Sequence, residues 1–150
     1  MRWNARRCPA PARQLLGLQA LRLSLVVIYV WFGALKLVDM SPACELVLAT
    51  AEMAPVFDTT TWLCLMGWGE IVIGLLFIFP QTIRLAVICL AGHMVATSLP
   101  MFFLPELSFQ SGHYYAPTLT GQYIIKNLMI ISAGLVIGGA LEVKRRSSKV

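Results

Sequence analysis

Four long apolar runs constrain this chain more than any other feature of its sequence. They cover about residues 15–38, 62–79, 85–104 and 123–141. Each run approaches the roughly 20 residues that an α-helix needs to span about 30 Å of hydrocarbon at about 1.5 Å per residue. A lone strand cannot satisfy its backbone hydrogen bonds in lipid, so each run is predicted to be helical. The sequence therefore predicts an all-α fold, a four-helix transmembrane bundle over residues 15–142.

The composition and the placement of charge agree with a protein that lies in a bilayer. Hydrophobic residues make up 58% of the 150 residues and charged residues only 13%, whereas a soluble domain has about 25% charged residues. The net charge of +5 would suit nucleic acid, but most basic residues lie toward the two ends of the chain: Arg2, Arg6, Arg7, Arg13, Arg22, Lys144, Arg145, Arg146 and Lys149. Basic residues that flank spans are typical of cytoplasmic segments. We therefore expect basic cytoplasmic ends at 1–14 and 143–150, and no nucleic-acid partner.

The two longer loops contain no basic residue and are predicted to face away from the cytoplasm. Asp39–Thr61 and Pro105–Gln122 contain Asp or Glu but no Lys or Arg, whereas Arg84 follows the short turn between the second and third spans. That turn begins at Pro80, which cannot continue a helix, and it makes the second and third spans antiparallel neighbours. The prediction is a multi-pass protein of the cell membrane with both termini cytoplasmic and an uncleaved first span.

Both outer loops show patterns of local structure. Ser41 followed by Pro42 is typical of a helix start. It predicts a short amphipathic helix over about Ala43–Met53, with Leu46, Val47 and Met53 at the membrane surface. The second outer loop mixes aromatic with polar residues. Two interpretations of it stay open, a lid folded over the bundle and an aromatic belt at the membrane interface.

The cysteines and histidines give little support for a metal site. The cysteines at 8, 44, 64 and 89 show neither a CxxC pair nor the spacing of zinc ligands. Cys44 and Cys64 are both expected near the outer surface, which leaves a disulfide between them open. The favoured interpretation is that the cysteines are small apolar residues. With His93 as the only histidine in a span, no metal or haem site is expected.

Glu70 is the most informative single residue. An ionisable group in a span costs about 2.5–3.5 kcal/mol on insertion scales and usually faces the protein interior. Gly67 and Gly74 share its helical face, and small residues mark close helix packing. Lys36, on a face of the first span with Tyr29 and Gly33, is its predicted partner. Side chains lean toward the N-terminus of their own helix, so these two antiparallel spans bring the charges together.

Three further polar residues complete a predicted cluster in the outer half of the bundle. His93 lies near the middle of the third span, and a lone buried histidine is more often a hydrogen-bonded core residue than a ligand. Asn127 is expected to point inward, on the face of a GxxxG pattern. For Lys126 the simpler explanation is that its ammonium reaches the lipid head groups. The cluster of Lys36, Glu70, His93, Lys126 and Asn127 is either a ligand-binding pocket or a structural network, and both stay open.

Several short motifs give the chain a resemblance to the DoxX family of small membrane proteins. WFGALK at Trp31–Lys36 closes the first span, and GEIVIGLL at Gly69–Leu76 lies in the second. Arg84 opens the third span, and GQYIIKNL at Gly121–Leu128 looks characteristic of a subgroup. The resemblance covers about residues 18–142.

The resemblance implies a four-helix bundle in which Lys36 and Glu70 match the family's lysine and glutamate positions. Some DoxX members are subunits of quinone-linked oxidoreductases. We therefore expect a redox-associated subunit that binds quinone or a similar small molecule in the outer half of the bundle, with a redox partner protein as electron source. Bundles such as vitamin K epoxide reductase use a CxxC pair that this chain lacks, which argues against dithiol catalysis.

Two other functions stay open. One is a non-enzymatic membrane scaffold or assembly protein in which the ion pair only locks the helices together. The other is a small-solute transporter, which four short spans without interruptions support only if the protein forms a homo-oligomer.

Overall fold

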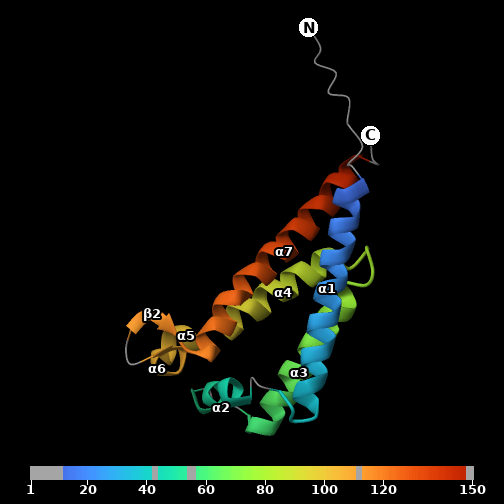
Figure 1. Cartoon of the computed structure of the whole chain (residues 1–150). Coiled ribbons are helices and arrows are strands. Elements are labelled where there is room, and N and C mark those ends of the chain that lie inside the picture. The colour runs from blue at the N-terminus through green and yellow to red at the C-terminus, as the bar shows by residue number, and fades with distance from the viewer. Residues whose placement is uncertain (1–11, 42–43, 54–56, 111–112, 148–150) are drawn as a thin grey trace.

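The computed structural model describes residues 12–41, 44–53, 57–110 and 113–147, and it has the predicted all-α architecture (Figure 1). Its long helices are α1 (Ala12–Leu37), α3 (Thr59–Leu76), α4 (Ile83–Ser98) and α7 (Leu119–Ser147). Within these residues, four segments are long and apolar enough to cross a membrane. The chain is therefore a multi-pass membrane protein, and the four predicted spans are confirmed.

Shorter elements fill the two longer loops. The first loop contains α2 (Cys44–Met53), which confirms the predicted short helix, although residues 42–43 of its predicted start lie outside the described residues. The second loop contains α5 (Pro100–Phe103), α6 (Pro105–Ser108) and an antiparallel hairpin of β1 (Phe109–Gln110) and β2 (His113–Pro117). The hairpin was not predicted from the sequence.

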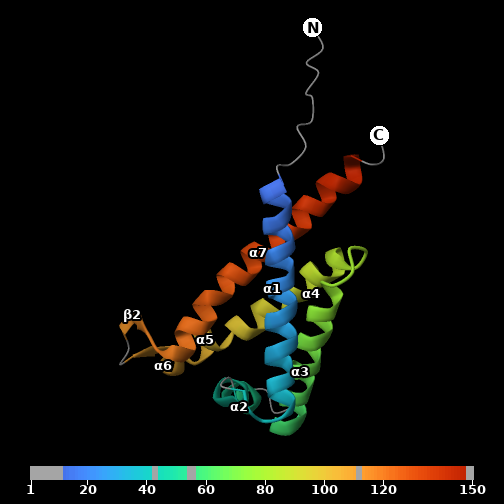
Figure 2. The ribbon, with the colours of Figure 1, turned by 45° about the vertical axis from the view of Figure 1, so that its right-hand side comes forward.

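The long helices form two pairs, with α1 packed along α3 and α4 packed along α7. The pairs lie closest in the half of the bundle that contains the start of α1 and the last part of α7, and they diverge toward the other end (Figures 1 and 2). We call the end of the bundle where α1 begins and α7 ends the terminal end. The opposite end contains α2, α5, α6 and the hairpin, and we call it the loop end.

The ends of α3 differ from the predicted bounds for local reasons. α3 begins at Thr59 because the carboxylate of Asp58 caps it, accepting hydrogen bonds from the Thr61 N–H at 3.1 Å and the Thr61 hydroxyl at 2.6 Å. It ends at Leu76, before Pro80, and the hydroxyl of Thr82 donates to the Leu76 carbonyl at 2.6 Å. Side-chain hydrogen bonds to the backbone thus set both ends of α3, whereas the prediction followed hydropathy alone.

The other spans also differ at their ends. The predicted third span divides into α4 and α5, because Pro100 has no N–H to continue the hydrogen bonds of α4. The predicted fourth span is longer at both ends, and α7 extends to Ser147.

Glycines bring the backbones of α1 and α3 into direct contact. A Cβ atom added to Gly33 would lie 2.6 Å from the carbonyl oxygen of Gly67, and one added to Gly67 would lie 2.9 Å from the carbonyl oxygen of Gly33. One added to Gly74 would lie 2.9 Å from Val30. No real Cβ atom fits at such distances, so the close approach of these two helices depends on glycine.

Arg22 also joins α1 to α3. Its guanidinium donates hydrogen bonds to the carbonyl oxygens of Phe77 and Ile78, just beyond the last residue of α3. A cation at this end of a helix satisfies backbone carbonyls and interacts favourably with the helix dipole. Its position in the sequence places Arg22 with the basic residues expected in the cytoplasm. The structure shows that it also caps α3.

An apolar core fills the bundle from its middle toward the terminal end. It takes buried side chains from α1, α3, α4 and α7 and from the turn after α3: Leu25, Tyr29, Ile73, Phe77, Ile83, Ala86, Leu90, Met94 and Ile137. Beyond this core the two pairs diverge. The polar residues of the loop half are therefore not packed tightly between the two pairs as the core side chains are.

Candidate functional site

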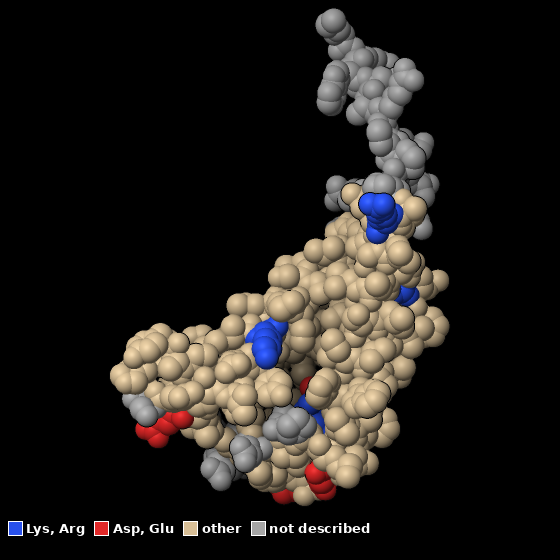
Figure 3. Space-filling model, in the orientation of Figure 1, with Lys and Arg blue, Asp and Glu red and all other residues tan. Residues whose placement is uncertain are grey.

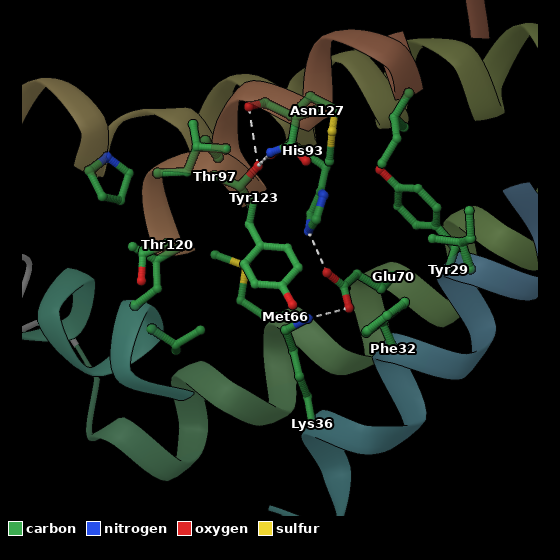
Figure 4. A pocket seen from close by; sticks show the side chains of 18 of the residues that line it. Tyr29, Phe32, Lys36, Met66, Glu70, His93, Thr97, Thr120, Tyr123 and Asn127 are labelled. Atoms are coloured by element: carbon green, nitrogen blue, oxygen red, sulfur yellow. Dashed lines mark hydrogen bonds and ion pairs between the residues drawn. The ribbon is translucent and has the colours of Figure 1, made fainter. Parts of the chain in front are cut away.

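A cavity of about 230 Å³ lies between the two helix pairs in the loop half of the bundle. Its lining comes from α1, α2, α3, α4, α7 and the first residue of α5, and most of it is apolar. Figure 3 shows a hollow on this face with acidic and basic atoms inside it. The polar side chains that matter most for its chemistry are drawn in Figure 4: Tyr29, Lys36, Glu70, His93, Thr97 and Asn127.

The buried ion pair of Lys36 and Glu70 lines the cavity. The ammonium nitrogen of Lys36 lies 2.6 Å from Oε2 of Glu70, and the two residues are 7% and 8% exposed. Gly33 and Gly67 precede them by about one turn each, so the backbone contact of α1 with α3 places the charges opposite each other. The predicted pair is present, and breaking it would leave one charge buried without its partner.

His93 approaches the same carboxylate from α4. Its Nε2 lies 3.4 Å from Oε1 of Glu70, so one carboxylate faces a cation on one side and an imidazole on the other (Figure 4). Neither ring nitrogen of His93 has a hydrogen-bond partner among the residues that the structure describes. The imidazole is therefore not the hydrogen-bonded core residue that the sequence favoured.

Tyr29 belongs to the site but was not among the predicted site residues. It is 3% exposed and lines the cavity, and its hydroxyl has no hydrogen-bond partner within the described part of the chain. Its ring packs edge-on against His93, with 5.7 Å between the ring centroids. The signal was its spacing, because Tyr29, Gly33 and Lys36 repeat at one helical turn on the same face of α1.

Unpartnered buried groups need a physical explanation. Leaving a buried donor or acceptor without a partner costs about 1–3 kcal/mol, and native structures contain few such groups. The hydroxyl of Tyr29 and Nδ1 of His93 are of this kind, and both residues line the cavity beside Glu70. A small molecule with polar atoms in the cavity would satisfy them.

Asn127 points inward as predicted, whereas Lys126 does not join the cluster. The amide of Asn127 donates to the hydroxyl of Thr97 at 3.4 Å, and that hydroxyl donates to the backbone carbonyl of His93 at 3.0 Å. Lys126 is exposed, and its ammonium nitrogen lies 5.6 Å from the ring centroid of Tyr123. The structure thus brings four of the five predicted residues together and adds Tyr29 and Thr97.

Helix α2 covers the cavity toward the loop end. Leu46 and Val47 line the cavity, and Val47 is only 9% exposed. These two side chains, predicted at the membrane surface, thus face the cavity, because the divergence of the two pairs opens a space that α2 covers. The side chain of Met53, predicted beside them, lies outside the described residues. The sequence could not show this space, since it depends on how the pairs cross.

The β1–β2 hairpin is not a lid over this site. No described hairpin residue lines the cavity, and Tyr114 and Tyr115 are 75% and 83% exposed. The hairpin residues therefore do not cover this site, whereas Thr120 of the same loop lines it. The exposed tyrosines agree with the other interpretation, an aromatic belt.

Cys44 and Cys64 are free thiols, so the disulfide left open from the sequence is absent. Trp62 and Met66 line the cavity from α3, and Cys64 lies about 200° around the helix from Trp62. Cys64 is exposed there, away from the α2 residues that cover the cavity. Cys8 lies outside the described residues. Within the described ranges, no group of three or more His, Cys, Asp and Glu side chains is arranged to hold a metal ion.

The site combines an ion pair, an imidazole and a phenol in a mostly apolar cavity. These groups can donate hydrogen bonds to the oxygen atoms of a small ligand and accept hydrogen bonds from them. Compared with known proteins, the chain matches no family model, no curated protein and no solved structure.

Proposed function

We propose that this chain is a redox-associated membrane subunit that binds quinone, or a similar ring molecule with oxygen substituents, in the cavity between its helix pairs. One observation supports this most directly: the unpartnered Tyr29 hydroxyl and His93 ring lie beside the buried Lys36–Glu70 pair in an otherwise apolar cavity. The resemblance to the DoxX family, some of whose members serve quinone-linked oxidoreductases, agrees with this choice.

The residues have complementary roles toward such a ligand. A quinone carbonyl needs a donor, which the hydroxyl of Tyr29 or the ammonium of Lys36 supplies. A quinol hydroxyl needs an acceptor, which Oε1 of Glu70 or a ring nitrogen of His93 supplies. Glu70 and His93 also exchange the proton that a ring oxygen gains or loses with each change of redox state. A redox partner protein supplies or accepts the electrons.

We place the loop end of the bundle outside the cell membrane and both termini in the cytoplasm. The loops at 39–61 and 105–122 contain no basic residue, whereas both ends of the chain are basic. The apolar core lies between the cavity and the terminal end. Ligand and protons are therefore exchanged from the outer half of the membrane. The same core argues against passage of a solute through a single copy of the bundle.

Quinone retention tests this function. The protein is purified in a mild detergent, its lipids are extracted, and quinone is quantified by mass spectrometry per mole of protein. We expect wild-type protein to retain quinone and Glu70→Gln to reduce retention by about tenfold, the effect of losing about 1.4 kcal/mol of binding. Glu106→Gln, which changes an exposed carboxylate outside the cavity, is the matched control. Circular dichroism checks that each variant stays helical.

The proposal fails if wild-type protein carries no quinone, or if Glu70→Gln retains as much quinone as wild type.

The scaffold function remains the second candidate, because the ion pair also joins α1 to α3. Replacing both charges, as in Lys36→Met with Glu70→Leu, distinguishes the two functions. A structural role predicts that the double variant keeps its cellular function while each single variant is damaging. A quinone-binding role predicts that the double variant folds but loses quinone retention.

A further inference from the structure

The cavity is open at its side. Among its lining residues, Ile28 and Phe32 of α1 are 36% and 42% exposed, and Tyr123 of α7 is 57% exposed. Toward the loop end, the lining residues Val47 and Pro100 are buried, and Leu46, Trp62 and Thr120 are half-buried. Figure 3, in the orientation of Figure 1, shows the hollow between the arm that contains α1 and the arm that contains α7. We call the gap flanked by Ile28, Phe32 and Tyr123 the window.

The window faces the hydrocarbon of the bilayer. Ile28 and Phe32 lie well inside the first membrane-spanning segment, and Tyr123 lies inside the last. Exposed apolar side chains within a span contact lipid rather than water. A molecule that enters the cavity through the window therefore comes from the membrane.

The size of the cavity limits what it can enclose. Pockets that bury a drug-sized ligand have volumes of about 300–1,000 Å³, and this cavity has about 230 Å³. It has room for a single substituted ring but not for a long chain as well. If an apolar chain of the ligand passed out through the window, it would lie in the hydrocarbon of the bilayer. Binding would then expose no apolar surface of the ligand to water.

We propose that the ligand is an amphiphile dissolved in the membrane, with its ring beside Tyr29, Glu70 and His93 and its apolar chain passing through the window into the lipid. This inference rests on the proposed function for the ring and goes beyond it for the chain. It defines the ligand class as long-chain membrane molecules that enter the cavity from the lipid.

Two probe compounds test the inference, a methoxy-substituted benzoquinone without a side chain and the same ring with a decyl chain. Their dissociation constants are measured for purified full-length protein in one detergent. The partition of each compound into micelles is the same for every variant. For one compound, the ratio of the dissociation constant of a variant to that of wild type therefore reports only contacts with the protein.

Ile28→Trp narrows the window, and Tyr123→Trp narrows it from the opposite side. We expect each to weaken binding of the decyl compound about tenfold more than binding of the ring alone, which corresponds to about 1.4 kcal/mol. Val27→Trp is the matched control, because Val27 is 51% exposed on the neighbouring position of α1 and does not line the cavity. It should affect neither compound. If one window variant does not fold, as judged by circular dichroism and gel filtration, the other decides the result.

The possible failures are distinguishable. If wild type binds both compounds and the window variants weaken both equally or neither, the chain does not pass through the window and this inference is overturned alone. If wild type binds neither compound, the proposed quinone function is overturned, and the inference with it.

Discussion

The two helix pairs of this bundle are held together by different kinds of contact. In the α1–α3 pair the backbones touch at Gly33 and Gly67, where an added Cβ would lie 2.6 Å or 2.9 Å from a carbonyl oxygen. In the α4–α7 pair an added Cβ on Gly138 would lie 3.4 Å from the side chain of Val87, an ordinary van der Waals distance. One on Gly134 would lie 3.2 Å from the side chain of Leu90. The GxxxG pattern of the last span therefore marks contacts with side chains, not with backbone.

This difference explains why the site has a tightly held ion pair on one side and a cavity on the other. The closely packed pair contains Lys36 and Glu70, and their charged atoms lie 2.6 Å apart. The contact between the pairs, from His93 to Glu70, is 3.4 Å long and leaves both ring nitrogens of His93 without a hydrogen bond in the described structure. The charges are thus positioned within one pair, and the space for a ligand lies between the pairs.

The largest expected effect comes from breaking the Lys36–Glu70 ion pair between α1 and α3. Lys36→Met leaves the carboxylate of Glu70 buried without its cation, which should lower the free energy of unfolding by about 3–5 kcal/mol. Adding Glu70→Leu should restore most of this loss, because no unpaired charge remains. The measurement is unfolding by SDS in mixed micelles, followed by circular dichroism. Lys126→Met, at an exposed lysine outside the cavity, is the control. Equal stability of Lys36→Met and wild type would contradict a buried pair.

The next largest effect tests the comparison of the pairs directly. Gly33→Ala should lower the free energy of unfolding by about 1–3 kcal/mol, because the new methyl group meets backbone that cannot move without separating α1 from α3. Gly138→Ala adds the same methyl group to the other pair and should change stability by less than about 1 kcal/mol. The same SDS titration measures both variants. Similar losses in the two would show that the pairs are packed alike.

A smaller effect is expected at the terminal end of the α1–α3 pair. Arg22→Met removes the charged donor from the carbonyl oxygens of Phe77 and Ile78. It should cost about 1–2 kcal/mol of stability, since the carbonyls lose their hydrogen bonds and the helix end loses a favourable charge. Arg13→Met, at an exposed position of the same helix, provides the control. A loss in the control as large as that in Arg22→Met would mean that general charge, rather than the cap, is responsible.

The smallest effect is a pH dependence at the start of α3. Hydrogen bonds from the hydroxyl and the backbone N–H of Thr61 lower the pKa of Asp58 below its usual value. Because the pKa is lower in the folded chain, this stabilisation is complete above the unfolded pKa and is lost as the pH falls through the folded pKa. Asp58→Asn keeps a capping side chain that does not titrate. The difference in Tm between wild type and this variant should therefore shrink or reverse on acidification, and a difference independent of pH would contradict the cap.

The sequence alone was sufficient for the spans and for one contact between them. The length of an apolar run is a local property, so the four spans could be counted without knowing how they pack. The contact of Lys36 with Glu70 could be predicted for two reasons. Side chains on antiparallel helices tilt toward each other here, and the neighbouring glycines indicate that the two helices pack closely. Asn127 could be placed on the inner face by the same helical periodicity.

Only the tertiary structure showed what surrounds that pair. The inclusion of Tyr29, the position of α2 over the cavity and the window beside it depend on how far the two helix pairs diverge. The cap that Arg22 forms on α3 depends on the packing within one pair. A local sequence pattern specifies which face of a helix is buried, but the crossing of two faces is decided by all the side chains that must fit between them.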